Sequence, residues 1–461
     1  MSHAWRCRCV SSPMISFWRS GSRVRSVRIA EREVGQATVL GYGRTGRAVA
    51  EYLHEHGVKT FVSDSSCLSD ADRNSLMNLR IAFEDGGHTQ RAIEGADVIV
   101  PSPGIDPTAA IMQLARVRGI PIISELDLAY LRSGDTRIIA VTGTNGKSTT
   151  VRLIEGILRG EGIDAIAAGN IGLPFITLAD DPPDVVVLEV SSFQLEQSNL
   201  FHPQVACLLN ISPDHLDRHG SMEEYVAVKM SIFARQAAND TAILPRGIDP
   251  SKSTIAARIA RFDDVGLPEN PFVESLPPHN RSNLRAAIAC CRGILPDLKA
   301  DDIDLPSLEG AFHLPYRMQE ERACGSVRVI NDSKSTNAAS AITALRSIEG
   351  QCVLILGGRH KGVGYDDLAR VIVQRDLRSV ILYGEGASFL QATLRDVGYT
   401  HITPCSDLEC ALRAAVSEAH DGDAILFSPA CSSYDQYGNY VERGEHFSLL
   451  VRSTLGQESD S

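Results

Sequence analysis

The segment Thr142–Thr150 carries the strongest chemical signal in the sequence. It reads TGTNGKSTT and lies between the apolar stretch RIIAV and the helical pattern VRLIEGILRG. A strand, a glycine loop and a helix N-terminus in this order form a cradle for phosphates, because backbone N–H groups point at them. Lys147 adds a positive charge, and the Ser148 hydroxyl can ligate Mg²⁺. The general P-loop pattern has glycine where Val141 stands, so this loop is a shortened form. A glycine-rich turn with an exposed lysine is the alternative.

Two further residues with metal-binding chemistry follow apolar strand patterns. Glu189 ends the run PDVVVLE, and a carboxylate beside a phosphate loop is a natural oxygen ligand for Mg²⁺. A buried structural carboxylate is the alternative interpretation. His215 lies in the acidic loop PDHLD, where a metal or phosphate role competes with hydrogen bonding to Asp214 or Asp217. The residues alone leave that choice open.

A second glycine motif, GYGRTG at Gly41–Gly46, lies between a strand and a helix, and Asp64 ends the next strand. This is the full dinucleotide-binding spacing. By itself it would support an NAD-dependent oxidoreductase, but such an enzyme leaves Thr142–Thr150 unexplained. Because a phosphate loop and two more α/β blocks follow, such an oxidoreductase does not account for the chain as a whole.

The overall composition is that of a soluble globular enzyme. The chain has 461 residues, 43% of them hydrophobic and 22% charged, which is enough for two or three domains. Its formal net charge of −12 argues against binding to nucleic acid or to an anionic membrane face. No apolar run has the length of a transmembrane helix. The eleven cysteines lack the paired CxxC spacing of a zinc site, which fits a reducing cytoplasm.

Short apolar strands alternate with helical stretches from Ala37 onwards, which is the rhythm of parallel sheets covered by helices. The strand patterns read TVLGYG, KTFVSD, ADVIVPSPG, IPIISE, TRIIAVTG, PDVVVLEVSS, QVACLLNIS, SVRVINDS, CVLILGG, SVILYG and DAILFSP. Most end in Gly, Ser, Asn, Asp or Pro, and ligands of open α/β sheets bind at the carboxyl ends of the strands. Polar or proline-bearing stretches place boundaries near residues 125 and 314, which gives domains over 34–125, 126–314 and 315–461.

The first thirty residues carry six arginines and no acidic residue before Glu31. An organellar transit peptide has this composition. An upstream start codon read in error, or a basic tail without a function, would give it as well. We expect residues 1–33 to be a dispensable basic tail.

Several motifs together resemble one enzyme family. The loop GTNGKST is followed by GNIG at 169–172, EVSSFQLE at 189–196 and NISPDHLD at 210–217. Further on stand Tyr225 to Lys229, HNRSN at 279–283, NDSKSTN at 331–337 and SPACSS at 428–433. In this order they resemble the muramoyl-peptide (Mur) ligases, whose relatives the folylpolyglutamate synthases share the phosphate loop. The resemblance runs from about residue 37 to about residue 450.

The resemblance implies an α/β fold of three domains: a Rossmann-like UDP-binding domain, a central P-loop ATPase-like domain and a C-terminal Rossmann-like domain that binds glutamate. It implies a cytoplasmic, monomeric enzyme of peptidoglycan precursor synthesis that uses ATP and two Mg²⁺ ions and small-molecule substrates, without nucleic-acid or membrane partners. The loops are similar to those of the member that adds D-glutamate to UDP-N-acetylmuramoyl-L-alanine. In the implied reaction, the L-alanyl carboxylate becomes an acyl phosphate that the glutamate amine attacks.

The resemblance also implies roles for individual residues. Lys147, His215 and Lys229 are the expected catalytic residues. Lys229, which by itself would be interpreted as a surface residue, matches a lysine that CO₂ converts into a carbamate. Together with Ser148, Glu189 and His215 it is an expected metal ligand. The residues expected to contact ATP are Gly143, Thr144, Asn145, Gly146, Lys147, Ser148, Thr149, Asn280, Asn283, Arg317 and Asp332. Those expected to contact the other two substrates are Thr45, Asp64, Ser65, Ser102, Pro103, Gly104, Asn170, Lys334, Lys361, Ser433, Tyr434 and Tyr440.

Two positions depart from the family pattern. Tyr316 stands where a histidine usually precedes the arginine at 317, and Ser66 stands where an arginine ends the D-x-R element, which puts one uridine-side contact in doubt. A sister branch that adds L-glutamate characteristically lacks the lysine of its acceptor motif, so Lys334 favours D-glutamate. A folylpolyglutamate synthase would lack a separate N-terminal nucleotide domain. The residues that a scaffold without activity would be expected to lose are all present: Lys147, Glu189, His215 and Lys229.

Overall fold

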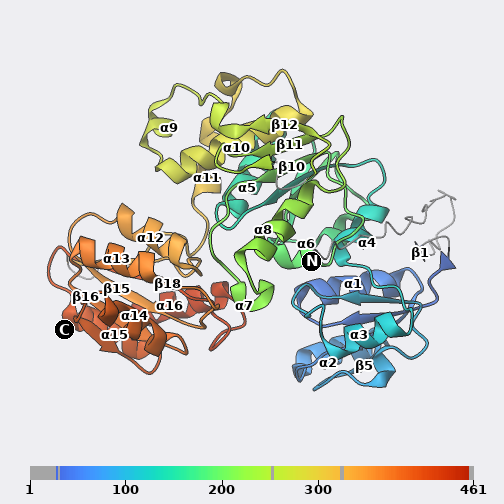
Figure 1. Ribbon diagram of the computed structural model, residues 1–461, viewed down its shortest axis with the longest axis horizontal. Coiled ribbons are helices and arrows are strands. Elements are labelled where there is room, and N and C mark those ends of the chain that lie inside the picture. The colour runs from blue at the N-terminus through green and yellow to red at the C-terminus, as the bar shows by residue number, and fades with distance from the viewer. Residues whose placement is uncertain (1–26, 30–31, 251–253, 322–325, 456–461) are drawn as a thin grey trace, which may run out of the picture.

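The computed structural model describes residues 27–29, 32–250, 254–321 and 326–455, which form three lobes in chain order (Figure 1). Each lobe has a sheet of its own, and a short antiparallel pair, β1 (Arg28–Ile29) and β2 (Arg32–Glu33), precedes them. The prediction of three α/β domains is confirmed, while their boundaries stay predictions. The basic tail expected over residues 1–33 lies largely outside the described residues.

The first lobe is a parallel four-stranded sheet in the order β5-β4-β3-β6. Successive strand residues point to opposite faces, so Val39 packs in one apolar cluster with helix α1 while Leu40 packs in another with helix α3. Its elements are β3 (Gln36–Leu40), α1 (Arg44–Glu55), β4 (Lys59–Ser63), α2 (Asp70–Asn78), β5 (Ala82–Glu84), β6 (Val98–Pro101) and α3 (Ala110–Val117).

One predicted strand, IPIISE at residues 120–125, is wrong. Only Ile122 pairs there, through a single bridge to Ile99. The Ser124 side chain accepts a hydrogen bond from the Asp127 backbone N–H and so caps a helix, α4 (Glu125–Arg132). A helix start therefore ends the extended segment after one pairing.

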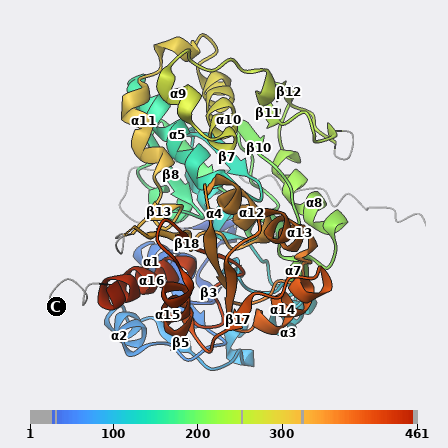
Figure 2. The same ribbon diagram turned by 90° about the vertical axis from the view of Figure 1, so that its left-hand side faces the viewer.

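The central lobe is a parallel six-stranded sheet in the order β12-β11-β10-β7-β9-β8. Helices α5, α10 and α11 lie on the side of this sheet that faces away from the first lobe, as both views show (Figures 1 and 2). Its strands are β7 (Arg137–Thr142), β8 (Ala165–Gly169), β9 (Val185–Glu189), β10 (Val205–Leu208), β11 (Thr241–Leu244) and β12 (Arg258–Arg261). Its helices after α4 are α5 (Lys147–Gly160), α6 (Ser192–Glu196), α7 (Leu216–His219), α8 (Met222–Met230), α9 (Pro271–Ser275), α10 (Pro278–Ile294) and α11 (Leu305–Phe312).

The third lobe is a six-stranded sheet in the order β13-β14-β18-β15-β16-β17, in which only β13 runs antiparallel to its neighbour among the described strands. Its strands are β13 (Gln319–Glu320), β14 (Arg328–Asn331), β15 (Cys352–Gly357), β16 (Ser379–Tyr383), β17 (Ile402–Pro404) and β18 (Ala424–Ala430). Its helices are α12 (Ala338–Ser347), α13 (Asp366–Arg375), α14 (Ala387–Asp396), α15 (Leu408–Glu418) and α16 (Tyr440–Leu455).

The lobes are joined in two different ways. One continuous apolar cluster runs from the first lobe into the central lobe and includes Val49 of α1 as well as Phe175 and Leu188. The third lobe has apolar clusters of its own, against which Leu216 of the central lobe packs. We infer that the first two lobes form one firm body, because shared apolar burial resists separation. None of the helices that the structure describes combines the length and apolar character that a membrane span requires.

A buried carboxyl group lies where the first two lobes meet. Glu125 is 2% exposed and lies among Pro101, Pro103 and Gln194. One of its carboxyl oxygens accepts a hydrogen bond from the Ile176 backbone N–H at 2.9 Å. Burial raises the pKa of Glu125 to about 7, since a charge at this place would lose its hydration.

We predict that Glu125→Gln stabilises the protein increasingly as the pH rises. The folded protein holds the Glu125 proton up to about pH 7, whereas the unfolded chain releases it near pH 4.5. Folding therefore takes up a proton between these values, and the contribution of this group to stability falls as the pH rises. Relative to wild type, the free energy of unfolding of the variant should rise by about 3 kcal/mol over this window. Denaturant titrations at a series of pH values measure this difference in the free energy of unfolding. Glu349→Gln, at an exposed position, is the control. A difference that does not change with pH would contradict the prediction.

Candidate active site

The predicted phosphate loop is a sharp turn between β7 and α5. Gly143 and Gly146 have φ angles of 151° and 88°, which side chains disfavour. The Lys147 ammonium folds back and donates hydrogen bonds to the carbonyl oxygens of Gly143 at 2.8 Å and Thr144 at 2.9 Å. Asn210, which follows β10, accepts a hydrogen bond from the Asn145 N–H and donates one to the Asn145 carbonyl. The neighbouring strand thus holds the loop in one shape.

Glu189 lies directly beside this loop, at the end of β9. Its carboxylate accepts a hydrogen bond from the Ser148 hydroxyl at 2.6 Å and another from the Asn170 amide at 2.8 Å. A carboxylate and a hydroxyl are hard oxygen donors and fit Mg²⁺. In the described part of the chain no cluster of three His, Cys, Asp or Glu side chains could enclose a metal by itself. An ion held here would therefore complete its coordination with phosphate oxygens and water.

Lys229 is buried and not at the surface, so its interpretation as a surface residue is wrong. It is 2% exposed on α8, and its ammonium donates a hydrogen bond to the Gly143 carbonyl at 2.9 Å and lies 4.8 Å from the centre of the Tyr225 ring. Burial, and then the charge of Lys147, lower the pKa of Lys229 well below its usual value. A lowered pKa favours the neutral amine that reaction with CO₂ requires.

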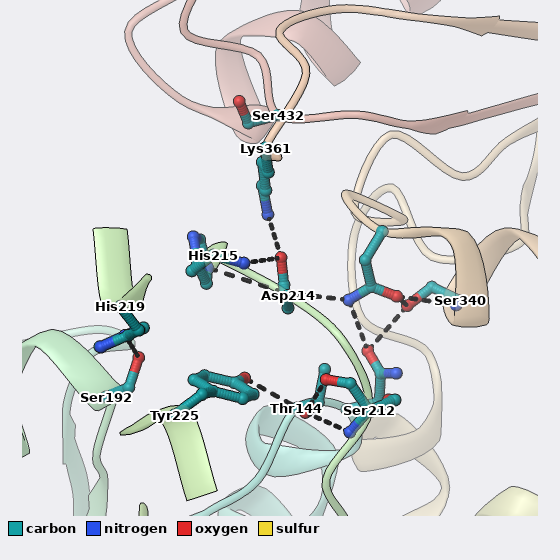
Figure 3. A network of polar contacts seen from close by, with 12 residues as sticks. Thr144, Ser192, Ser212, Asp214, His215, His219, Tyr225, Ser340, Lys361 and Ser432 are labelled. Carbon is teal, nitrogen blue, oxygen red and sulfur yellow. Dashed lines mark hydrogen bonds and ion pairs between the residues drawn. The ribbon is translucent and has the colours of Figure 1, made fainter. Parts of the chain in front are cut away.

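His215 and Asp214 form the part of the site that faces the third lobe (Figure 3). His215 has a left-handed backbone, with φ at 54°, and its ring packs edge-on to Phe193 at 4.8 Å. Burial, and then the charge of Lys361, lower the pKa of His215 to about 3, so its imidazole is neutral. Although burial alone would raise the pKa of Asp214, the charge of Lys361 and hydrogen bonds from Lys361 and Asn337 hold it below its usual value. A neutral imidazole beside a carboxylate can ligate a metal ion.

Side chains of the third lobe reach into the central lobe at this place. The Lys361 ammonium lies 2.9 Å from the Asp214 carboxylate, and both side chains are buried (Figure 3). The Lys334 ammonium donates to the Ser148 hydroxyl at 3.0 Å and to the Tyr440 hydroxyl at 3.2 Å. Further contacts are those of Arg317 with Thr149, and of Asn337 and Ser340 with Asn145. The structure therefore brings Lys334, Lys361 and Arg317 to the phosphate loop.

Two polar residues at the edge of the phosphate loop fit a bound nucleotide. Asn283 is buried, its Nδ2 has no hydrogen-bond partner among the described residues, and its Oδ1 lies 2.4 Å from the place that a Cβ on Gly146 would take. A buried amide without a partner indicates a missing polar group. Asp332, at the end of β14, accepts a hydrogen bond from the Ser428 hydroxyl, and burial raises its pKa to about 6. Asn280 lies one turn before Asn283 on α10.

The predicted residues of the first lobe surround its own glycine turn. The Asp64 carboxylate accepts hydrogen bonds from the backbone N–H groups of Tyr42 and Ser66, and the Ser102 hydroxyl donates to the Gly41 carbonyl. Among the predicted residues of the third lobe, Ser433 is buried and the Tyr434 side chain is 64% exposed. The remaining predicted positions near these turns are Thr45, Ser65, Pro103 and Gly104.

The departure at Tyr316 has a structural reason. Its ring lies against Gly444 of α16, where a Cβ would come within 2.4 Å of it. Its carbonyl oxygen accepts a hydrogen bond from the Lys334 backbone N–H at 3.0 Å, and its φ is 57°. The Tyr316 ring thus packs on Gly444 in the third lobe, and the Tyr316 carbonyl holds the backbone of Lys334. The structure assigns no such replacement for the arginine missing at Ser66.

Several site residues are missing from the sequence-based prediction. Asp214 contacts Lys361 and the Asn337 amide, while Asn210 braces the phosphate loop. Arg218 reaches from α7 to the first lobe. Asn210, Asp214, Arg218 and Asn337 lie inside or next to the motifs NISPDHLD and NDSKSTN, which follow the buried strands β10 and β14. Their place in or beside polar segments that follow buried strands is the signal that could have found them.

Family models match most of the described chain. The model of the Mur ligase MurD-like N-terminal domain matches residues 35–124, that of the Mur ligase middle domain matches 141–264, and that of the Mur ligase glutamate ligase domain matches 316–431. A UDP-N-acetylmuramoylalanine–D-glutamate ligase of Salinibacter ruber is 37% identical over 458 residues, which covers 91% of this chain and 98% of the relative. The chain belongs to the Mur ligase family. A Mur ligase of the same name from Pelotomaculum thermopropionicum is 34% identical, with 90% of this chain and 97% of the relative covered.

Solved structures of Mur ligases share the fold. The UDP-N-acetylmuramate-alanine ligase MurC of Thermotoga maritima matches with a TM-score of 0.57 at 17% identity, over 91% of this chain and 99% of that chain. The MurF ligase of the same organism, in complex with ADP, matches with a TM-score of 0.55 at 16% identity, over 87% and 96%. At this identity the likeness shows the three-domain Mur ligase fold alone.

We predict that Gly146→Ala weakens the binding of a nucleotide at the phosphate loop. The Cβ of an alanine at position 146 would lie 2.4 Å from Asn283 Oδ1. The alanine would also have to adopt the φ of 88° that Gly146 has. The loop must shift, so its backbone N–H groups no longer point at the phosphates of the nucleotide. Calorimetric titration with ADP should give a dissociation constant raised about tenfold or more. Gly160→Ala is the matched control in the same helix, because a Cβ there meets nothing within 4 Å. Equal affinities of the two variants would contradict the prediction.

Proposed function

We propose that this Mur ligase joins D-glutamate to UDP-N-acetylmuramoyl-L-alanine with the conversion of ATP into ADP and phosphate. The observation that carries the proposal is the alignment, over nearly the full length, with relatives of this name at 31–37% identity. The site supports it, because each lobe of the chain provides one part. The first lobe has a nucleotide-type glycine turn, the central lobe has a phosphate loop, and the third lobe has two lysines suited to an anionic amino acid. We further propose a monomeric enzyme of the cytoplasm that makes peptidoglycan precursors.

ATP lies along residues 143–149 in this proposal. Lys147 and Arg317 place positive charge at its phosphates, Asp332 faces the ribose, and Asn280 and Asn283 face the adenine. The orphaned Asn283 amide supports this orientation. Two Mg²⁺ ions would be held by Ser148, Glu189, His215 and a carbamoylated Lys229. When bound, they supply positive charge that neutralises the phosphate oxygens.

Bond formation proceeds in two steps. The L-alanyl carboxylate attacks the γ-phosphorus of ATP, ADP leaves, and an acyl phosphate results. Lys147 and Lys334 stabilise the charge on the transferred group, since both ammoniums lie at the phosphate loop. The glutamate amine then attacks the acyl carbon, loses a proton and displaces phosphate, which leaves the amide. The substrates come from separate lobes, so closure of the third lobe completes the site.

Glutamate binds in the third lobe, next to the phosphate loop. Lys334, Lys361, Ser433, Tyr434 and Tyr440 are the proposed contacts, and two lysines suit its two carboxylates. The first lobe binds the UDP part of the other substrate through Thr45, Asp64, Ser65 and the loop 102–104, while Asn170 of the central lobe lies on the way to the reacting end. This arrangement accounts for all three lobes, which an NAD-dependent oxidoreductase would not.

We predict that the purified protein releases phosphate from ATP when UDP-N-acetylmuramoyl-L-alanine, D-glutamate and Mg²⁺ are present together. L-Glutamate in a parallel reaction should give no turnover, because Lys334 belongs to the D-glutamate form of the acceptor motif. Lys147→Ala, which removes the ammonium at the phosphate loop, should lose activity about a thousandfold. Turnover with L-glutamate alone would move the protein to the sister branch. Silence with both acceptors would overturn the proposal.

We predict that Lys229 carries a carbamate. CO₂ adds to a neutral amine with loss of a proton, and burial keeps the pKa of Lys229 low. After equilibration with ¹³C-bicarbonate, ¹³C NMR should detect a carbamate carbon in the wild-type protein. The signal should vanish in Lys229→Gln and persist in Lys59→Gln, which changes an exposed lysine. A signal that survives Lys229→Gln, or none in wild type at saturating label, would refute the carbamate.

A further inference from the structure

A loop of the first lobe is held by side chains of the central lobe. The Arg218 guanidinium donates hydrogen bonds to the carbonyl oxygens of Ile105 at 2.8 Å and Gly104 at 3.3 Å. The Gln197 side chain donates a further hydrogen bond to the Ile105 carbonyl at 2.8 Å. The loop itself is fastened to the glycine turn of its own lobe, because Ser102 donates to the Gly41 carbonyl. Two side chains of the central lobe therefore hold this loop directly.

Arg218 is fixed on its other side as well. Its Nε and Nη2 donate to the same Glu196 carboxylate oxygen at 3.2 Å and 2.9 Å, and its guanidinium lies 5.2 Å from the centre of the Phe193 ring. The side chain is 13% exposed. A planar fork that donates in several directions and lies on a ring suits arginine and cannot be reproduced by lysine. The guanidinium thus has one defined position.

That position is coupled to the metal-binding part of the site. Arg218 follows His215 by three residues and belongs to the short helix α7. The Phe193 ring beneath the guanidinium is the same ring that packs edge-on to the His215 imidazole at 4.8 Å. Arg218 therefore connects the loop of the first lobe, through the Phe193 ring, with His215, which faces Lys361 and the phosphate loop.

We propose that Arg218 is a positioning residue that fixes the register between the loop Ser102–Ile105 and His215. The inference rests on the proposed function, in which this loop binds the UDP-linked substrate. The nucleotide end of that substrate is held at Gly41–Thr45, while its carboxylate must reach the phosphate loop in another lobe. Reacting atoms have to approach within about 3.5 Å, so a displaced loop would have to be brought back into register on binding, which weakens the binding of the UDP-linked substrate.

The shared apolar cluster alone does not set this register. It holds the first two lobes together, but apolar contact is non-directional and tolerates small slides. Hydrogen bonds from a fixed guanidinium to two backbone carbonyls are directional. Removing them should leave the fold in place and displace the substrate loop.

Steady-state kinetics with each substrate varied in turn tests the proposal. Arg218→Lys keeps the charge and loses the fork, so the KM for UDP-N-acetylmuramoyl-L-alanine should rise about tenfold. The KM values for ATP and D-glutamate should stay within about twofold, because their contacts lie elsewhere. Gln197→Leu should raise the same KM by a smaller factor. Arg370→Gln, at an exposed ion pair of the third lobe, is the control for the loss of an arginine, and thermal melting of each variant verifies folding.

The outcomes separate the two proposals. Wild-type turnover together with a selective rise in the KM for the UDP-linked substrate supports the positioning role. Wild-type turnover with three unchanged KM values in Arg218→Lys, or with a lower kcat alone, overturns this role and leaves the proposed function intact. Absence of turnover in the wild type overturns the proposed function and this inference together.

Discussion

The buried excess of positive charge around the phosphate loop is the constraint on which the site depends. Lys147 has Glu189 and Asp214 as its carboxylate neighbours and Lys334 and Lys361 as further cations. Burial lowers the pKa of Lys147, and burial with the charge of Lys147 lowers that of Lys229. Desolvated like charges repel each other, so a polyanion or the conversion of one lysine into an anion relieves the whole group. The proposed ATP and the proposed carbamate of Lys229 would have these two effects.

Backbone geometry makes this charge distribution tolerable. The Gly143 carbonyl accepts hydrogen bonds from both the Lys147 and the Lys229 ammonium, which are four residues and 86 residues away in sequence. Only a glycine takes the φ of 151° with ease, and this turn directs the carbonyl towards both lysines. The parallel sheet explains why the other partners are near. Glu189 and Asn210 lie at or just after the carboxyl ends of β9 and β10, the two strands on either side of β7, where side chains of neighbouring strands converge.

The sequence predicts the local parts of this architecture well and the long-range parts less well. The loop after β7 and the strand that ends in Glu189 follow from patterns of neighbouring residues. The burial of Lys229 does not, because it depends on α8 packing under a loop far away in sequence. The strand expected at residues 120–125 fails because the Ser124 cap outweighs the apolar pattern. The contacts of Asp214 with Lys361, and of Arg218 with Ile105, join residues more than a hundred positions apart, and no local pattern encodes them.

The two kinds of contact between the lobes suit different tasks, because one holds two lobes firmly together and the other can be opened. Apolar burial fixes the first lobe on the central one, whereas the contact with the third lobe consists mainly of hydrogen bonds and one ion pair around the phosphate loop. Polar contacts of this kind can be exchanged for contacts with a substrate at little cost, because each group keeps a partner. In the proposed function, Lys361 joins the two lobes through Asp214 and also lies at the site of the glutamate carboxylates. The same buried ion pair would thus link closure of the third lobe to binding of the acceptor.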